Sequence, residues 1–314
     1  MNPRLKTVTA TALTALASLA FAEVPPAIAE RLRAIGPVIN PGATAPLYAP
    51  QFTETAPYVN AQVERDLAYG PHERHLLDVF TPVPSAGKRQ PVLVFVHGGA
   101  FVAGNRRAGP ASPFYDNVML WAVHHGLVGV NMTYRLAPQD PWPAGPQDIG
   151  QALRWVQQNI AQRGGDPSRV FLFGHSAGAA HVAAYVAMPG FQEGTGAGLA
   201  GAMLLSGIYR VTPELVAQSP TYPAYFGNDA SRYAETSSVN GLLATPTPLW
   251  IADAELDPPQ FKAQARLLRD ALRDAGRPFT AATFAAHSHM SEAYSINSQD
   301  SSVGDALWEF VKTH

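Results

Sequence analysis

A serine between two glycines, in Gly174-His175-Ser176-Ala177-Gly178, is the part of the chain best suited to chemistry. The apolar run Val170–Phe173 before it predicts a buried strand, and the alanine-rich run Ala179–Met188 after it predicts a helix. In a sharp strand-to-helix turn the serine backbone is strained, and a side chain two positions away on either side would collide with neighbouring elements. The turn pushes the hydroxyl outward, and the helix N-terminus favours developing negative charge. We therefore predict that Ser176 is a nucleophile.

A serine hydroxyl needs a base within hydrogen-bond reach before it can attack at neutral pH. Two histidines follow the apolar run Phe279–Phe284, which predicts a late strand. We favour His289 as the base, because it lies farther from the strand end and directly precedes the start of a predicted helix. His287 is the alternative.

The base in turn needs a carboxylate that fixes its tautomer. Three acids follow the predicted strand Leu249–Ala252. We favour Asp257, because it lies in the loop before the next predicted helix and Pro258 restrains the backbone beside it. Asp253 and Glu255 are the alternatives.

Attack on an acyl carbonyl also creates an oxyanion, which needs backbone N–H donors held in place. The segment His97-Gly98-Gly99-Ala100-Phe101 follows the predicted buried strand Val92–Val96, and its small residues allow close approach to a substrate. We expect the N–H groups of Gly99 and Ala100 to form the oxyanion hole with that of Ala177, and Gly98 is a further candidate. His97 is expected to organise this loop.

Strands that alternate with helices position these groups and predict an α/β fold, with a mostly parallel central sheet covered by helices on both faces. Residues 207–246 interrupt the alternation with an aromatic, proline-bearing insertion. Asp148 is expected to open a helix, where the helix dipole favours its charge. The other predicted strands are Ala61–Ala68 and His75–Phe80, which form an antiparallel hairpin, then Leu127–Asn131 and Ala202–Leu205; the predicted helices are Ser112–His125, Asp148–Ala161, Pro259–Ala275 and Gly304–Thr313.

Four segments together resemble the α/β-hydrolase superfamily, on the carboxylesterase side that includes the hormone-sensitive-lipase-like esterases. They are His97–Phe101, Tyr134-Arg135-Leu136-Ala137-Pro138, Gly174–Gly178 and Glu255-Leu256-Asp257-Pro258. The resemblance covers residues 58–314. It implies the α/β-hydrolase fold, with residues 207–246 as a small cap insertion over Ser176, and we read Tyr134–Pro138 as structural support.

The resemblance also bears on the reaction. Those esterases often carry Asp in place of His175 and a third glycine in place of Ala100. The Gly-His-Ser-Ala-Gly-Ala turn and the His-Met after Ser288 are more similar to kynurenine-formamidase-like and feruloyl or acetyl-xylan esterase-like enzymes. The resemblance implies a serine carboxylesterase that forms an acyl-enzyme on Ser176. The alternatives are an arylformamidase-like amidase and a non-catalytic ligand-binding protein, and the presence of Ser, Asp and His candidates in order opposes the latter.

Composition limits the remaining classes. With 314 residues, 46% of them apolar, the chain is long enough for one globular domain with an ample core. Its net charge of −2 gives no electrostatic reason to expect binding to nucleic acid. The lack of cysteine excludes thiolate catalysis and disulfides. No metal-ligand spacing or phosphate loop is present, so we expect no cofactor, no metal and a small-molecule ester as the binding partner.

The N-terminus predicts export. Arg4 and Lys6 precede the uncharged run Thr7–Phe21, and Ala20-Phe21-Ala22 offers small residues for cleavage after Ala22. We expect residues 1–22 to be a signal peptide, too short and too rich in Ala and Thr to span a bilayer comfortably, and the mature protein to be periplasmic or secreted. Residues 23–57 are expected to form an arm that is helical over Pro26–Ile35 and otherwise extended, and that either covers the active site or is disordered.

Overall fold

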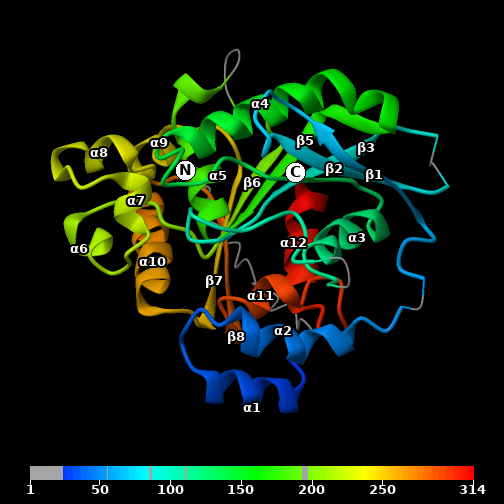
Figure 1. The fold of residues 1–314 in the computed structure, drawn as a ribbon, viewed down its shortest axis with the longest axis horizontal. Coiled ribbons are helices and arrows are strands. Elements are labelled where there is room, and N and C mark those ends of the chain that lie inside the picture. Colours follow the sequence, from blue (N-terminus) through cyan, green and yellow to red (C-terminus); the bar gives the residue numbers. More distant parts are fainter. Residues whose placement is uncertain (1–23, 55, 85–86, 110–111, 193–196) are drawn as a thin grey trace, which may run out of the picture.

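The computed structural model describes residues 24–314 except 55, 85–86, 110–111 and 193–196, so the predicted signal peptide lies outside the described residues. A single eight-stranded sheet crosses the molecule in the order β1-β2-β4-β3-β5-β6-β7-β8 (Figure 1). The strands are β1 (Ala61–Ala68), β2 (Leu76–Pro82), β3 (Gln90–Val96), β4 (Val128–Met132), β5 (Gly165–His175), β6 (Gly201–Leu205), β7 (Leu249–Leu256) and β8 (Thr280–Ser288).

The sheet is mostly parallel, as the sequence predicts. Strand β1 pairs with β2, and β2 with β4, in antiparallel fashion, whereas every pairing from β4 across to β8 is parallel. Parallel strands are buried on both faces and therefore read as continuous apolar runs. The run Val92–Val96 in β3 is an example, since all five of its residues are fully buried.

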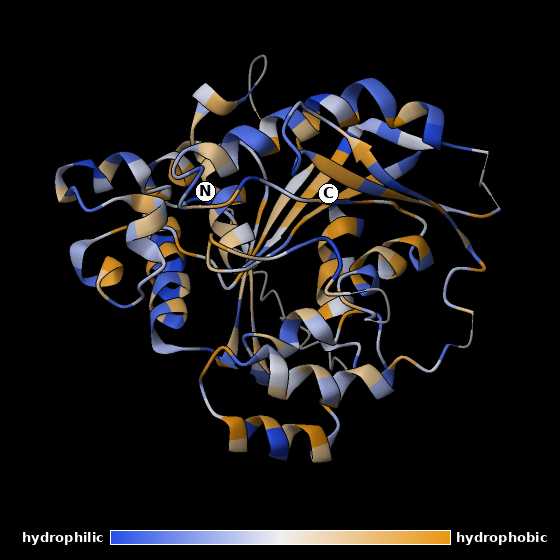
Figure 2. Cartoon of the chain, in the orientation of Figure 1, coloured by the Kyte–Doolittle hydropathy of each residue, from blue (hydrophilic) through white to orange (hydrophobic). Residues whose placement is uncertain are grey.

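Helices cover both faces of the sheet. On one face α4 (Ala144–Asn159), α5 (Ala177–Ala187) and α10 (Pro259–Asp274) pack in a core that contains Val92 and Val94. On the other face α3 (Asp116–His124) and α12 (Ser302–Thr313) pack in a core that contains Leu93 and Phe95. Figure 2 shows the result, with hydrophobic colour along the strands and hydrophilic colour on the outer turns of α4 and α10. These features define an α/β architecture of the expected class.

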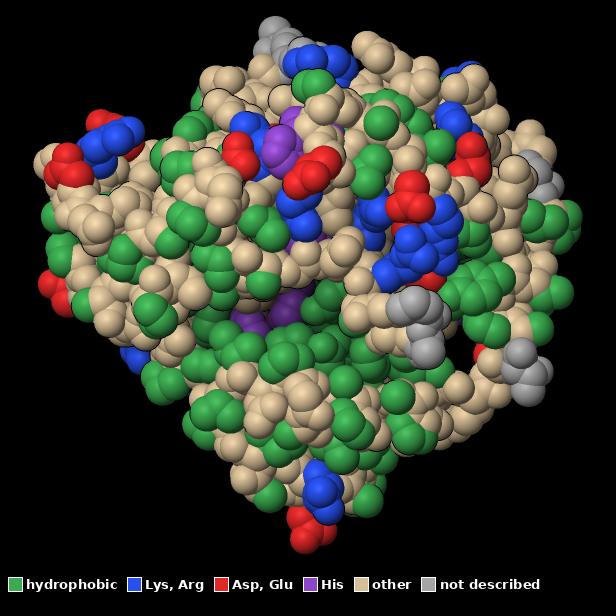
Figure 3. Space-filling view, in the orientation of Figure 1, with side chains coloured by type: hydrophobic (Ala, Val, Ile, Leu, Met, Phe, Trp, Pro, Cys, Tyr) green, Lys and Arg blue, Asp and Glu red, His purple; other side chains and the backbone are tan. Residues whose placement is uncertain are grey.

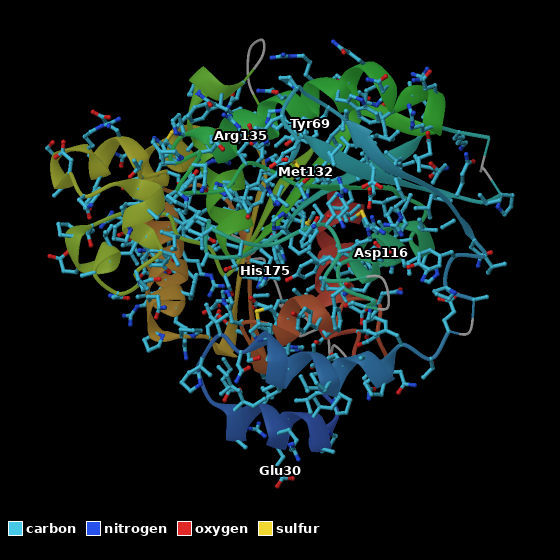
Figure 4. The ribbon with its side chains drawn as sticks, viewed as in Figure 1. Glu30, Tyr69, Asp116, Met132, Arg135 and His175 are labelled. Atoms are coloured by element: carbon cyan, nitrogen blue, oxygen red, sulfur yellow. The ribbon has the colours of Figure 1, made fainter. Side chains whose placement is uncertain are left out.

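The Tyr134–Pro138 segment is held by a buried acid. Helix α4 begins at Ala144, one turn earlier than predicted, so the interpretation of Asp148 as an N-terminal charge is wrong. Asp148 is fully buried, and its carboxylate accepts hydrogen bonds from the backbone N–H of Arg135 at 2.7 Å and from Nη2 of Arg135 at 2.7 Å. It also lies 3.1 Å from Nε2 of His75. In Figure 4 Arg135 lies in the same part of the molecule as Tyr69 and Met132.

The insertion at residues 207–246 consists of short helices, and its aromatic side chains pack inward. Tyr225 stacks on Phe101 with ring centroids 4.4 Å apart, and Tyr222 and Phe226 contact the same ring edge-on. These aromatic residues are therefore a core that joins the insertion to the loop after β3. The helices are α6 (Pro213–Val216), α7 (Tyr222–Phe226), α8 (Tyr233–Thr236) and α9 (Val239–Ala244).

The arm before β1 is more helical than predicted. Helix α1 occupies Pro26–Ile35, as expected, but a second helix, α2 (Pro41–Tyr48), replaces the extended chain expected there. The side chain of Asn40 caps it by accepting a hydrogen bond from the N–H of Ala43 at 3.0 Å. In Figure 1 α2 lies just below α11 (Ser291–Tyr294) and α1 lies below α2, and Figure 4 shows Glu30 of α1 pointing away from the molecule. No helix among the described residues is long and apolar enough to cross a bilayer. The short 3₁₀ turns are Ala49–Gln51, Ala161–Arg163, Pro189–Phe191 and Ala230–Arg232.

Candidate active site

The carboxyl ends of the parallel strands meet at one edge of the sheet, which is where ligands bind in such sheets. Ser176 follows β5, Ser206 follows β6, Asp257 follows β7 and His289 follows β8, so four segments far apart in the sequence converge there. Figure 3 shows the surface hollowed near its centre, with histidine side chains at the floor and hydrophobic side chains around it. His175 is labelled at the corresponding place in Figure 4.

Ser176 has the strained backbone that the motif predicts, with φ 58° and ψ −123°. A Cβ atom added at Gly174 would lie 2.5 Å from the carbonyl oxygen of Gly178, and one added at Gly178 would collide with the carbonyl oxygen of Val96. Both glycines are therefore required by backbone contacts. The N–H of Ser176 donates to the carbonyl of Leu205 at 2.9 Å, which ties the turn to β6.

Ser176, His289 and Asp257 form one chain of hydrogen bonds. The Oγ of Ser176 lies 2.8 Å from Nε2 of His289, and Nδ1 of His289 lies 2.7 Å from Oδ1 of Asp257. His289 and Asp257 are each 1% exposed and Ser176 is 6% exposed. The carboxylate can thus hold the imidazole with Nδ1 protonated, leaving Nε2 free to take the serine proton.

Asp257 has further donors on its second oxygen. The hydroxyl of Ser206 donates to Oδ2 at 2.5 Å, and the N–H of Ala254 donates to it at 3.0 Å. Burial acts to raise the pKa of Asp257, but the hydrogen bond and charge of His289, together with these two donors, outweigh it and leave the pKa below its usual value. The carboxyl group therefore stays ionised beside the imidazole.

The alternative base, His287, lies in a separate buried network. Its Nδ1 is 3.0 Å from Oγ of Ser291, and its Nε2 is 2.8 Å from Oγ of Ser302 and 3.4 Å from Asp300. Tyr48 of α2 donates to the same Asp300 at 3.0 Å. This network fastens α2 to the end of β8, directly before His289.

The two alternative acids also have other partners. Oδ1 of Asp253 accepts from Nη2 of Arg269 at 2.8 Å and from the hydroxyl of Thr283 at 2.7 Å. Oε2 of Glu255 accepts from the N–H of Ala286 at 2.7 Å. Both acids thus link β7 to neighbouring elements, whereas the carboxylate that contacts His289 belongs to Asp257.

The glycine-rich loop after β3 lies against the serine. A Cβ atom at Gly98 would be 2.9 Å from Cβ of Ser176, and Gly99 and Ala100 both have positive φ, at 135° and 51°. Ala177, the residue after the serine, is the first residue of α5, where backbone N–H groups have no intrahelical partner. The structure therefore places Gly98 against Ser176 and Ala177 at the start of the helix that follows the serine, while Gly99 and Ala100 continue the loop after Gly98.

His97 contacts its own loop. Its Nδ1 donates to the carbonyl of Gly98 at 2.6 Å, and its ring stacks on Tyr134, whose hydroxyl donates to the carbonyl of His97 at 2.8 Å. Burial lowers the pKa of His97 to about 3, so the ring is neutral. These contacts agree with the expected role of His97, which is to organise its loop, and with the expected structural role of Tyr134–Pro138.

Three neighbours of the triad were missed in the sequence. Ser206 follows a parallel strand, a position that signals a site residue in such sheets. His175 donates from Nε2 to the backbone carbonyl of His289 at 2.8 Å, and burial lowers its pKa to about 3. Glu292, three residues after His289, lies 3.3 Å from the same nitrogen.

Donor atoms of His175, His289 and Glu292 lie within 4.8 Å of one another, but the triad already uses both nitrogens of His289, so we assign no metal.

A mostly parallel sheet, a strained serine turn between strand and helix, and the order Ser176, Asp257, His289 along the chain together show that this chain has the α/β-hydrolase fold. Residues 74–209 match the model of the carboxylesterase family. That stretch contains the glycine-rich loop and Ser176, but not Asp257 or His289.

The chain is also similar to curated proteins and to solved structures that are named as esterases. The chain is 32% identical over 229 residues to Esterase LipQ of Mycobacterium tuberculosis, covering 67% of this chain and 53% of the relative. It is 39% identical over 153 residues to a human cocaine esterase, covering 46% of this chain and 25% of that protein. The chain thus spans about half, or less, of the length of these relatives. Esterase B from Lactobacillus rhamnosis, solved with a tributyrin phosphonate inhibitor, shares the fold with a TM-score of 0.71 at 17% identity, over 91% of this chain and 96% of that one.

Proposed function

We propose that this protein is a serine carboxylesterase that hydrolyses small carboxylic esters through an acyl-enzyme on Ser176. The observation that carries the proposal is the hydrogen-bonded chain from Ser176 through His289 to Asp257 at the carboxyl ends of the parallel strands. The family match and the names of the esterase relatives support ester bonds as the target.

In the acylation step the Oγ of Ser176 attacks the acyl carbon while Nε2 of His289 takes its proton. Asp257 orients the imidazole and stabilises its charged form. The N–H groups of Ala177, Gly99 and Ala100, with Gly98 as a further donor, receive the negative charge on the carbonyl oxygen. His289 then returns the proton to the leaving alcohol, and the ester bond breaks.

Deacylation repeats the sequence with water. His289 takes a proton from the water, whose oxygen attacks the acyl carbon, and the proton passes back to Oγ of Ser176 as the acid leaves. The residues named supply the nucleophile, the base and the oxyanion donors, so the scheme uses no cofactor.

The test compares esters and amides on one enzyme. We expect the purified protein to hydrolyse a short p-nitrophenyl ester much faster than a formanilide, and the Ser176→Ala variant to lose ester turnover while it keeps a wild-type circular dichroism spectrum. Faster turnover of the formanilide would contradict the assignment as an esterase and indicate an arylformamidase-like amidase. Wild-type turnover by Ser176→Ala would refute the proposed nucleophile.

A further inference from the structure

Glu292 is a buried acid that the proposed mechanism does not use. It lies in α11 and is 0% exposed, in the turn that follows His289. Its carboxyl group faces the hydroxyl of Ser206 and lies 3.3 Å from Nε2 of His175. Neither carboxyl oxygen has a well-formed hydrogen bond among the described residues, and a buried polar group in that situation calls for an explanation.

The two neighbours of Glu292 are the groups that hold the triad. Ser206 donates to Oδ2 of Asp257, the oxygen that does not face His289. His175 donates to the backbone carbonyl of His289. Glu292 is thus next to the residue that holds Asp257, which is Ser206, and next to the residue that holds the backbone of His289, which is His175.

The charges around Glu292 oppose its ionisation. Asp257 and Asp253 act on it as negative charges, and the guanidinium of Arg269 is already engaged by Asp253. Burial first, and then the charge of Asp257, hold the pKa of Glu292 well above its usual value. The ionisable groups that face it from the packed elements are His175 of β5, Tyr209 after β6, Asp253 of β7, Asp257 after β7 and His289 after β8.

We propose that Glu292 is a positioning residue that serves the triad as an uncharged carboxylic acid. It supports Ser206 and His175, and these two residues keep Asp257 and His289 within hydrogen-bond distance of one another and of Ser176. The inference rests on the proposed function, because it assigns Glu292 to the same reaction. A carboxylate at this position would place a second negative charge beside Asp257, and the nearby guanidinium of Arg269 is already paired with Asp253.

The first test is the pH dependence of stability, which needs no substrate. A buried acid with a raised pKa stabilises the fold at low pH, and this stabilisation is lost as the pH rises from the unfolded-state value toward the folded-state value. Glu292→Gln removes that titration. As the pH rises above the ordinary pKa of a glutamic acid, the Tm of Glu292→Gln should therefore rise relative to wild type. Glu309→Gln, the same change at an exposed position of α12, should show no such trend.

The second test is kinetic. Glu292→Gln keeps the shape and neutrality of the acid, so its kcat on the p-nitrophenyl ester should stay within about threefold of wild type. Glu292→Ala removes the support, so its kcat should fall by about tenfold or more at an unchanged KM, because misplacement of catalytic groups is costly. Rescue by Gln but not by Ala is the signature of a neutral positioning group.

Two results would overturn the inference. One is a Tm difference between Glu292→Gln and wild type that stays constant over the whole pH range, and the other is a large loss of kcat in Glu292→Gln, which would mean that the carboxylate is needed. Failure of the proposed function has a different appearance, because wild type itself would then not turn over the ester.

Discussion

At the residue scale, three acids within five positions carry three different tasks. Asp253 pairs with Arg269, Glu255 accepts a backbone N–H, and Asp257 bonds to His289. The loop position before a helix was enough to favour Asp257 from sequence, and the distance from the strand end was enough to favour His289. The parts of Ser206, His175 and Glu292 were not predicted, because they depend on which side chains face one another across β5, β6 and α11.

The first prediction at this scale concerns the carboxylate. Asp257→Asn keeps the shape of the side chain but can hold the imidazole in the wrong tautomer, so we expect kcat on a p-nitrophenyl ester to fall by about 10³- to 10⁴-fold. Glu255→Gln, the same kind of change two residues earlier near the end of β7, should keep kcat within about threefold. Equal losses in the two variants would remove Asp257 from its assigned role.

At the element scale, the strand–turn–helix around Ser176 was predictable because its requirements are local. The two glycines are needed by contacts within the turn and with β3. Helix α2 was not predictable in the same way, since Pro41, Gly42 and Pro46 weaken the helical pattern and tertiary contacts decide the outcome. Tyr48 at its end is fixed by Asp300, 252 residues further along the chain.

The glycine requirement can be tested directly. Gly178→Ala places a methyl group against the carbonyl of Val96, so we expect a loss of about 1–3 kcal/mol in the free energy of unfolding and a lower kcat. Gly190→Ala is the matched control, because a Cβ atom there meets nothing within 4 Å. Denaturant unfolding of the two variants gives the comparison, and equal stability would show that the turn tolerates a side chain.

At the scale of the whole molecule, alternating strands and helices were sufficient to predict a parallel sheet with two covered faces. The buried strand residues confirm it by alternating between the two cores, with Val92 and Val94 on one face and Leu93 and Phe95 on the other. How the arm and the insertion at residues 207–246 pack on this sheet was not predictable, because their patterns are short and rich in proline and aromatic residues.

Export is a prediction for the intact protein. Residues 1–22 lie outside the described residues, and we propose that they direct the chain across a membrane and are removed after Ala22. Expression of the full chain in a bacterium should then give a periplasmic or secreted protein whose N-terminal residue is Glu23. A cytoplasmic product that retains Met1 would contradict this proposal.

The central claim is that the hydroxyl of Ser176 is a nucleophile activated by His289, and covalent labelling tests it most directly. The protein is treated with a fluorophosphonate, and the modified residue is located by peptide mass spectrometry. The account predicts one adduct, on Ser176, that forms far more slowly in His289→Ala and not at all in Ser176→Ala. An adduct on another residue, or an enzyme that hydrolyses esters and stays unlabelled, would contradict it.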